Sequence, residues 1–210
     1  LAGNALPNTE PATDQTYNVT NTVQVSSLTT TPSGVVLDFN TVIDVTTLNL
    51  YDSQSGALGL ADVTLVGNVV GAVRGSLILS SDHSQATFVT TGGPLAADTY
   101  TLTLRSAADG FKDTTGNLLD GNSDGTPGGD YTQTFVVTAT PANEVLVSIP
   151  DFARGYGQTV NLPNNSNSGI PITLSTGLDV TGVDLDLVFD PALLTITGFT
   201  TTIPGASAGF

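Results

Sequence analysis

Three observations predict an all-β protein folded as a β-sandwich. Short segments of alternating apolar and polar residues recur along the chain, and turn residues separate them about every 8–12 positions. No window keeps the 3.6-residue apolar period of a helix, and the best helical candidate, Pro191–Leu194, is a single turn at most. The 39% hydrophobic content is enough for a packed core, in spite of 23 Gly and 11 Pro.

The expected strands share this alternating pattern. Thr99–Arg105 is the clearest, because Tyr100, Leu102 and Leu104 fall on one face and polar residues fall on the other. Strands of this kind are half-buried and antiparallel. In chain order the expected strands are Val23–Leu28, Val35–Phe39, Leu48–Tyr51, Val63–Val66, Ser76–Leu79, Ala86–Val89, Thr99–Arg105 and Tyr131–Val137.

The chain is strongly acidic, with 19 acidic against 4 basic residues and a formal net charge of −15. Nucleic acid and anionic membrane surfaces are excluded as partners, because four scattered bases cannot form a basic patch. Such acidity suits divalent cations and salty exteriors. The absence of Cys excludes disulfides, thiolate metal sites and thiol nucleophiles.

The domain boundaries follow from a change in composition. The segment around Pro141 has the composition of a linker and separates two strand-rich regions. We expect a domain at residues 22–138, a linker at 139–144 and an incomplete second domain at 145–210. The chain has no Met, no signal peptide and no apolar run near the ~20 residues of a membrane span. We therefore expect an internal piece of a longer protein.

The first 21 residues carry the trace of an internal repeat. Gly3, Asn4 and Leu6 match the residues 113 positions further along the chain, and Tyr17 matches Tyr131, 114 positions further along. We expect this segment to be the tail of a preceding copy of the same module.

Four motifs carry a family resemblance in the first domain. They are Gly34–Phe39, Leu95–Leu102, Lys112–Asn117 and Asp124–Tyr131. With them, residues 22–138 resemble a bacterial Ig-like domain of the type repeated in S-layer proteins and large adhesins. The resemblance implies an immunoglobulin-like β-sandwich. It also places Tyr100 at a tyrosine corner, where a tyrosine hydroxyl ties a loop to a strand.

The second domain carries a different resemblance. Its motifs are Gly157–Val160, Ile170–Leu174 and Val183–Pro191. With them, residues 145–210 resemble the opening strands of a cohesin-like sandwich. The two resemblances together imply an all-β chain in which an immunoglobulin-like β-sandwich is followed by a partial second β-sandwich.

One loop is a candidate metal site. Asp120–Gly125 has the pattern D-x-N-x-D-G, and Asp130 follows five residues later. Alternate oxygen ligands on a tight turn suit Ca²⁺, which takes about 6–8 oxygens. The candidate ligands are Asp120, Asn122, Asp124 and Asp130. The alternative is a solvated hairpin loop, because neither flank is helical and Tyr131 stands where an EF-hand has Glu.

Two further sets of polar residues have structural interpretations. Asp184 and Asp186 alternate with apolar residues, so we expect them on the solvent face of a strand, although paired carboxylates also serve acid–base chemistry or bind cations. His83, the single histidine, lies in an expected turn between strands, where we expect it to be exposed. No nucleophile motif accompanies it. The sequence therefore predicts no enzyme.

We expect a structural or adhesive module of a large extracellular bacterial surface protein, S-layer or filament, stabilised by calcium. Its partners would be other copies or neighbouring domains of the same protein, up to a homopolymer. The alternative is an ancillary region of a secreted enzyme or scaffold that binds carbohydrate or a protein. Carbohydrate binding commonly uses exposed aromatic side chains, and the chain has no Trp and only 5 Tyr.

Overall fold

The computed structural model describes residues 22–50, 60–91, 93–152 and 169–209. These ranges contain ten strands and no helix. The chain divides into two compact units, Leu1–Thr176 and Gly177–Phe210. All ten strands belong to the first unit: β1 (Val25–Thr31), β2 (Gly34–Phe39), β3 (Val63–Gly67), β4 (Gly71–Val73), β5 (Gly75–Leu79), β6 (Gln85–Thr90), β7 (Asp98–Leu104), β8 (Tyr131–Val137), β9 (Val147–Ser148) and β10 (Thr173–Leu174).

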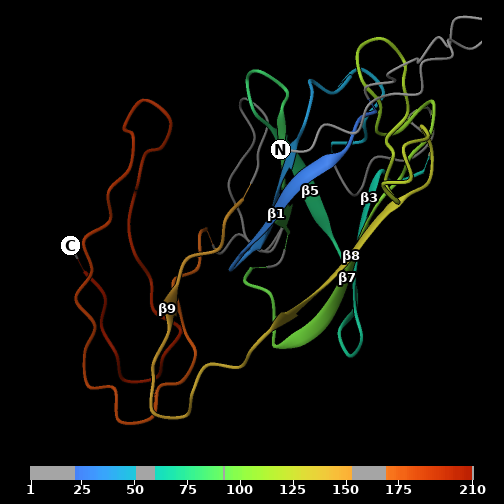
Figure 1. Cartoon of the computed structure of the whole chain (residues 1–210). Helices are drawn as coiled ribbons and strands as arrows, with labels where there is room; N and C mark the ends of the chain where they lie inside the picture. Colours follow the sequence, from blue (N-terminus) through green and yellow to red (C-terminus); the bar gives the residue numbers. More distant parts are fainter. Residues whose placement is uncertain (1–21, 51–59, 92, 153–168, 210) are drawn as a thin grey trace, which may run out of the picture. The chain divides into compact units, whose positions relative to one another are not determined.

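Eight of these strands form two antiparallel four-stranded sheets (Figure 1). One sheet has the order β1-β2-β6-β5, and the other has the order β4-β3-β7-β8. β9 and β10 form a separate two-stranded ladder. The prediction of an all-β fold is confirmed.

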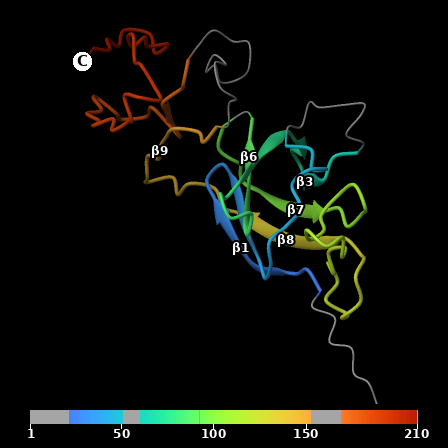
Figure 2. The ribbon, with the colours of Figure 1, turned by 90° about the horizontal axis from the view of Figure 1, so that it is seen from above.

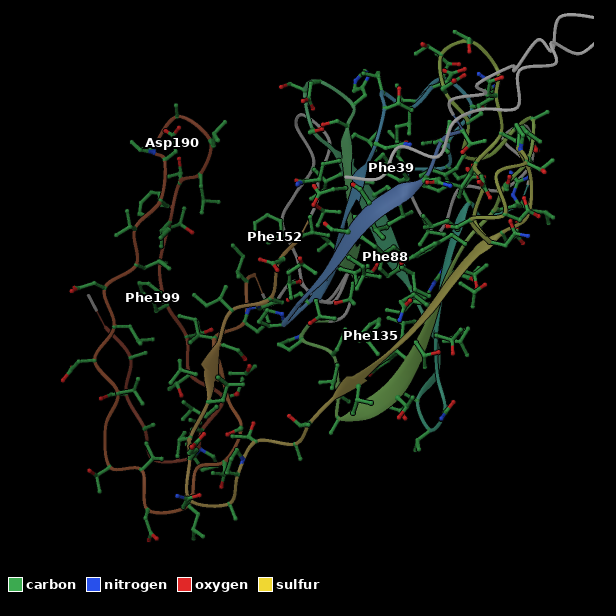
Figure 3. All side chains as sticks on the ribbon, viewed as in Figure 1. Phe39, Phe88, Phe135, Phe152, Asp190 and Phe199 are labelled. Atoms are coloured by element: carbon green, nitrogen blue, oxygen red, sulfur yellow. The ribbon has the colours of Figure 1, made fainter. Side chains whose placement is uncertain are left out.

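The two four-stranded sheets share one hydrophobic core, which makes them a β-sandwich. Alternate residues of β2 and β7 point inward, as the period of two requires. Phe39, Phe88 and Phe135 project from different strands into the space between the sheets (Figure 3). Phe39 stacks on Phe111 with ring centroids 5.6 Å apart, and Tyr100 stacks on Phe135 at 5.5 Å. These aromatic pairs join segments that are distant in sequence.

Tyr100 also fastens a loop to β7. Its hydroxyl donates a hydrogen bond to the carbonyl oxygen of Ala96 at 2.9 Å, while its ring is buried. The expected bond between this hydroxyl and the chain upstream is confirmed.

The strand expected at Leu48–Tyr51 is not a strand over its described residues, 48–50. Leu48 is buried as an apolar residue of the core should be. However, the amide of Asn49 donates to the carboxylate of Asp62 at 2.6 Å, so it is not available to a neighbouring strand. The carbonyl of Leu50 does accept the amide of Leu77 in β5 at 2.8 Å, but this contact does not extend into a strand.

The strand expected around Asp184 and Asp186 is also absent, because the described residues of the second unit contain no strand. Val183, Leu185 and Phe189 remain about two-fifths to one-half exposed. A strand needs a neighbour to complete its backbone ladder, and no described segment pairs with this one. The Pro191–Leu194 turn does form, with the amide of Ala192 donating to the carboxylate of Asp190.

The domain boundaries at 138 and 145 stay predictions. The first unit continues past Val137 to Thr176 and includes the short β9–β10 ladder. Within that unit Pro150 is buried, and the amide of Asp151 donates to the hydroxyl of Ser33 at 3.1 Å. The chain that follows β8 is therefore tied back to the sandwich. The expected preceding repeat at 1–21 and the motif Gly157–Val160 lie outside the described residues.

Candidate functional site: the Asp120–Asp130 loop

The loop that carries the candidate metal ligands lies at one end of the sandwich, between β7 and β8. The start of the described chain runs beside it (Figure 2). Val23 pairs with Leu119 in an isolated parallel bridge, and the amide of Asp120 donates to the carbonyl of Val23 at 2.8 Å. The loop is therefore built onto the segment that leads into β1.

Asp120 organises this loop from a buried position, since its residue is 1% exposed. Its carboxylate accepts the backbone amides of Asp124 and Gly125, each at 3.0 Å, and the side-chain amide of Gln24 at 2.8 Å. Burial works to raise the pKa of Asp120, but these hydrogen bonds outweigh it and hold the pKa below its ordinary value. The carboxylate thus serves as a built-in acceptor for the amides of its own loop.

The other three candidate ligands also make hydrogen bonds within the protein. Asp124 accepts the amide of Thr126 at 2.8 Å and the side-chain amide of Asn122 at 2.9 Å. Asp130 accepts the amide of Ser106 at 2.8 Å, so it ties this loop to the segment after β7. Asp124 and Asp130 are close in sequence, but Asp124 bonds within the loop and Asp130 bonds to another segment.

In this arrangement the three aspartates are not gathered around one point. Over the described ranges, no group of three or more His, Asp or Glu side chains is placed to hold a metal ion. Ca²⁺ binds oxygen atoms, but both carboxylate oxygens of Asp120, the most buried of the four residues, already accept backbone amides. Calcium binding would require Asp120 to exchange these partners for the ion.

Close backbone packing fixes the same loop. The amide of Gly121 donates to the carbonyl of Gly129 at 3.0 Å, which closes the base of the loop. A Cβ atom on Gly121 would lie 2.1 Å from the nitrogen of Tyr131 and 2.3 Å from the carbonyl carbon of Asp130. Only glycine fits there without a shift of the backbone.

A buried ion pair closes the neighbouring loop. The guanidinium of Arg105 contacts the carboxylates of Asp62 and Asp109, both at 2.6 Å. The Asp62 side chain is fully buried, whereas that of Asp109 is 57% exposed. Burial raises the pKa of Asp62, against the opposing effects of the Asn49 amide and Arg105. No local sequence pattern marks this pair, because Asp62 and Arg105 are 43 residues apart.

Asp113 and Asp98 organise two more turns in the same way as Asp120. Asp113 accepts the amides of Thr115 and Asn117 at 2.8 and 2.9 Å, and Asp98 accepts the amides of Val69 and Val70. Burial opposes the shift at Asp113, but its hydrogen bonds hold its pKa below the ordinary value. The Val70 amide is the largest cause of the lowered pKa of Asp98. Asp98, Asp113 and Asp120 thus stabilise turns by accepting backbone amides.

Of the residues considered for acid–base chemistry, His83 makes the contacts of a turn. His83 lies in the turn between β5 and β6 with a φ of 56° and is half-buried, not exposed as expected. Its amide and carbonyl bond to Ser80 and Ile43, while Asp82 accepts the hydroxyl of Ser80 at 2.6 Å. Asp184 and Asp186 lie in the separate second unit. These contacts assign His83 and Asp82 to a turn.

A groove lined by residues of β1, β5, β6 and the segment 149–152 has no acid–base pair among its lining residues. It has a volume of about 530 Å³, and Asp151 is its only charged lining residue. The lining consists of Thr31, Ile78, Thr87, Val89, Ile149, Pro150, Asp151 and Phe152.

Within the described ranges, no helix has the length and apolar character that crossing a membrane would need.

No family model matches the chain, and neither does any curated protein. Three solved structures are similar to it. The structure of surface layer protein SbsC, domains 1–6, is 16% identical with a TM-score of 0.40, over 60% of this chain and 15% of that one. The N-terminal part of the bacterial S-layer protein SbsC is 16% identical with a TM-score of 0.39, over 60% and 26%. The S-layer protein rSbsC(31-844) is 15% identical with a TM-score of 0.39, over 72% and 18%.

The chain therefore spans about a quarter or less of the length of each of these proteins. A TM-score below 0.5 does not establish a common fold. The functional proposal accordingly rests on the residues of this chain.

Proposed function

We propose that this chain is a structural or adhesive module of a large extracellular bacterial surface protein, S-layer or filament, and not an enzyme. The observation that carries the proposal is that the sandwich is fastened on both sides. On one side the segment before β1 is bonded to Asp120. On the other, the chain beyond β8 returns to Ser33 through Asp151. Such ties suit a module that transmits position and load to its neighbours.

The strand order supports an immunoglobulin-like assignment for this module. Counted along the chain, β1, β2, β6 and β5 take the places of strands A, B, E and D of that fold. β4, β3, β7 and β8 take the places of C′, C, F and G. Tyr100, near the start of β7, makes the backward hydrogen bond of a tyrosine corner.

The chemistry of the aspartates supports a structural role. Asp113 and Asp120 each accept two backbone amides within their own turns, and Asp98 accepts two from the turn between β3 and β4. A catalytic base instead needs to reach a substrate proton, with a pKa near the working pH. The pKa values of these three groups are lowered, which moves them away from such a role.

The composition supports a location outside the cell and partners of the same kind. A net charge of −15 suits a salty exterior, where screening reduces self-repulsion. The same charge disfavours nucleic acid. Other copies or neighbouring domains of the same protein are the proposed partners.

Calcium stabilisation through Asp120, Asn122, Asp124 and Asp130 is a separate proposal, supported by their spacing and the acidity of the chain. It requires the loop to rearrange around the ion. A dication present at a concentration of 100 times its Kd would add about 2.7 kcal/mol to the free energy of unfolding. We expect a higher Tm with Ca²⁺ than with EGTA, and no difference in Asp120→Ala/Asp124→Ala. Equal Tm values with Ca²⁺ and with EGTA in the unsubstituted chain would contradict this proposal.

The location is tested with antibodies raised against the purified chain. We expect them to label intact cells of the source bacterium, and we expect mild protease treatment of those cells to remove the signal. Labelling that needs permeabilised cells would contradict the proposal. A hydrolase screen of the purified chain tests the absence of activity. Turnover abolished by a single substitution would overturn that part.

A further inference from the structure

The chain beyond β8 crosses the outer face of the β1-β2-β6-β5 sheet. Val89 of β6 is 4% exposed, although its neighbour Phe88, and not Val89, belongs to the core between the sheets. Successive side chains of a strand point to opposite faces, so Val89 faces away from the core. The groove on that side is lined by this face of the sheet and by the segment Ile149–Phe152, which we call the strap.

The strap is anchored at the turn between β1 and β2. The amide of Asp151 donates to the hydroxyl of Ser33, which is 1% exposed, at 3.1 Å. Pro150 is buried, and its Cβ would lie 3.9 Å from a Cβ built on Gly93. Between described residues, the bond from Asp151 is the one hydrogen bond that joins the strap to the two sheets. The strap is therefore fixed to the sheet at one point and otherwise rests on its surface.

This attachment is weaker than that of the strand before it. A groove of about 530 Å³ lies between the strap and the sheet. Ile149 of the strap and Ile78 of β5 stay 40% and 43% exposed, so their contact with the rest of the protein is incomplete. By contrast, β8 pairs with β7 along all 7 of its residues. Local opening begins where buried apolar contacts and backbone bonds are few, which here is the strap.

A length of chain without strand structure separates β8 from the strap. Residues 138–146 form no strand, and nearly all of them are exposed. β9 follows and pairs with β10, so the two-stranded ladder lies directly next to the strap in the chain. Residues 138–150 span at most about 47 Å when fully extended. Release of the strap would let the ladder move away by up to that length while the sandwich stays folded.

We propose that the strap is a releasable latch, which detaches from the sheet under load before either sheet unfolds and so lengthens the chain between the sandwich and the β9–β10 ladder. This inference rests on the proposed function as a load-bearing surface module, and it adds the element that yields first. A pull from the C-terminal side reaches the strap before it reaches β8. Ser33 stays in place when the strap leaves, because its carbonyl accepts the amide of Thr90 at 2.8 Å. The latch can therefore close again when the load falls.

The direct test stretches single molecules in magnetic tweezers. Because the protein has no Cys, Thr64→Cys in β3 and Asp151→Cys in the strap give two unique attachment sites at exposed positions. The substitution at Asp151 keeps the backbone amide that bonds to Ser33. We expect two successive steps. The first is a short extension of at most about 47 Å at low force, which reverses when the force is lowered, and the second is a longer extension as the sandwich unfolds.

A matched pair of variants assigns the short step to the latch. Ser33→Ala removes the acceptor of the Asp151 amide, so it should lower the force of the short step or abolish that step, with the long step unchanged. Thr30→Ala, at an exposed position of β1 near the same turn, should change neither step. Extension of the unsubstituted strap in a single step with the sandwich would overturn the proposal. A short step that Ser33→Ala leaves unchanged would overturn it as well.

Hydrogen exchange provides a second measurement on the native chain. The Asp151 amide should exchange at least tenfold more slowly than an unprotected amide, and at least tenfold faster than the amide of Leu102, which lies in β7 between β3 and β8. Ser33→Ala should bring Asp151 toward the unprotected rate and leave Leu102 unchanged. Equal protection of the two amides would show that the strap opens only with the sandwich, and it would contradict the latch, as would exchange of Asp151 at the unprotected rate. Neither measurement bears on cell-surface labelling, so failure of the latch is distinguishable from failure of the proposed function.

Discussion

Arg105 offers a quantitative test of how the acidic loops are held. Its guanidinium contacts the fully buried carboxylate of Asp62 and the half-exposed carboxylate of Asp109. It also donates to the carbonyl of Asp109 at 2.9 Å. Arg105→Ala therefore leaves the Asp62 carboxylate buried with the Asn49 amide but without a cation.

The expected loss in free energy of unfolding is about 3–5 kcal/mol, the usual result of removing one partner from a buried ion pair. For a domain of this size such a loss lowers Tm by roughly 10 °C or more. Asp109→Ala is the matched control. It removes the exposed partner and should cost much less, because solvent screens that contact.

Urea unfolding of the variants at pH 7 measures the effect, and its pH dependence identifies the cause. Without Arg105 the pKa of Asp62 rises further, and a raised folded pKa favours the folded state as pH falls. The deficit of Arg105→Ala should therefore shrink on acidification, and Asp62→Asn/Arg105→Ala should be more stable than Arg105→Ala at pH 7. A loss no larger than that of Asp109→Ala would refute this reasoning.

Three further predictions concern the turns. Tyr100→Phe removes the hydrogen bond to Ala96 and should lower the free energy of unfolding by about 1 kcal/mol; no change in urea unfolding would contradict this. Gly121→Ala should cost roughly 1–3 kcal/mol by the same assay because its Cβ meets backbone, whereas Gly182→Ala, with nothing within 4 Å, should not destabilise the chain. The lowered pKa values of Asp98, Asp113 and Asp120 predict that Tm is steady above the unfolded pKa near 4 and falls at lower pH. A Tm that rises as the pH falls from 4 to 2 would contradict the predicted direction of this pH dependence.

The strands that face the core could be predicted because burial imposes an alternating pattern. β2, β6, β7 and β8 lie within two residues of their expected bounds. β4 was missed, since Gly71–Val73 is too short for a pattern. Leu48–Leu50 shows the reverse error, because Leu48 is buried and the carbonyl of Leu50 bonds to Leu77, but no strand forms. Alternation therefore reports which residues face the core, and strand pairing depends on where the amides bond.

The candidate site was predictable in its location but not in its bonding. The D-x-N-x-D-G pattern places acidic and amide side chains on a tight loop, as found. The pattern is the same whether Asp120 binds a cation or accepts amides. The deciding partner, Gln24, is 96 residues away, and no local pattern could supply it.

Backbone order parameters from NMR relaxation test the central claim, that the module is fastened where the chain enters and leaves it and is locked at the adjoining loop. The informative residues are Gln24, Asp120 and Asp151. We predict values near 0.85, as in rigid backbone, for all three in the native chain. Values below about 0.6 at Gln24 and Asp151, with rigid strands between them, would show a module on free tethers and would contradict the account.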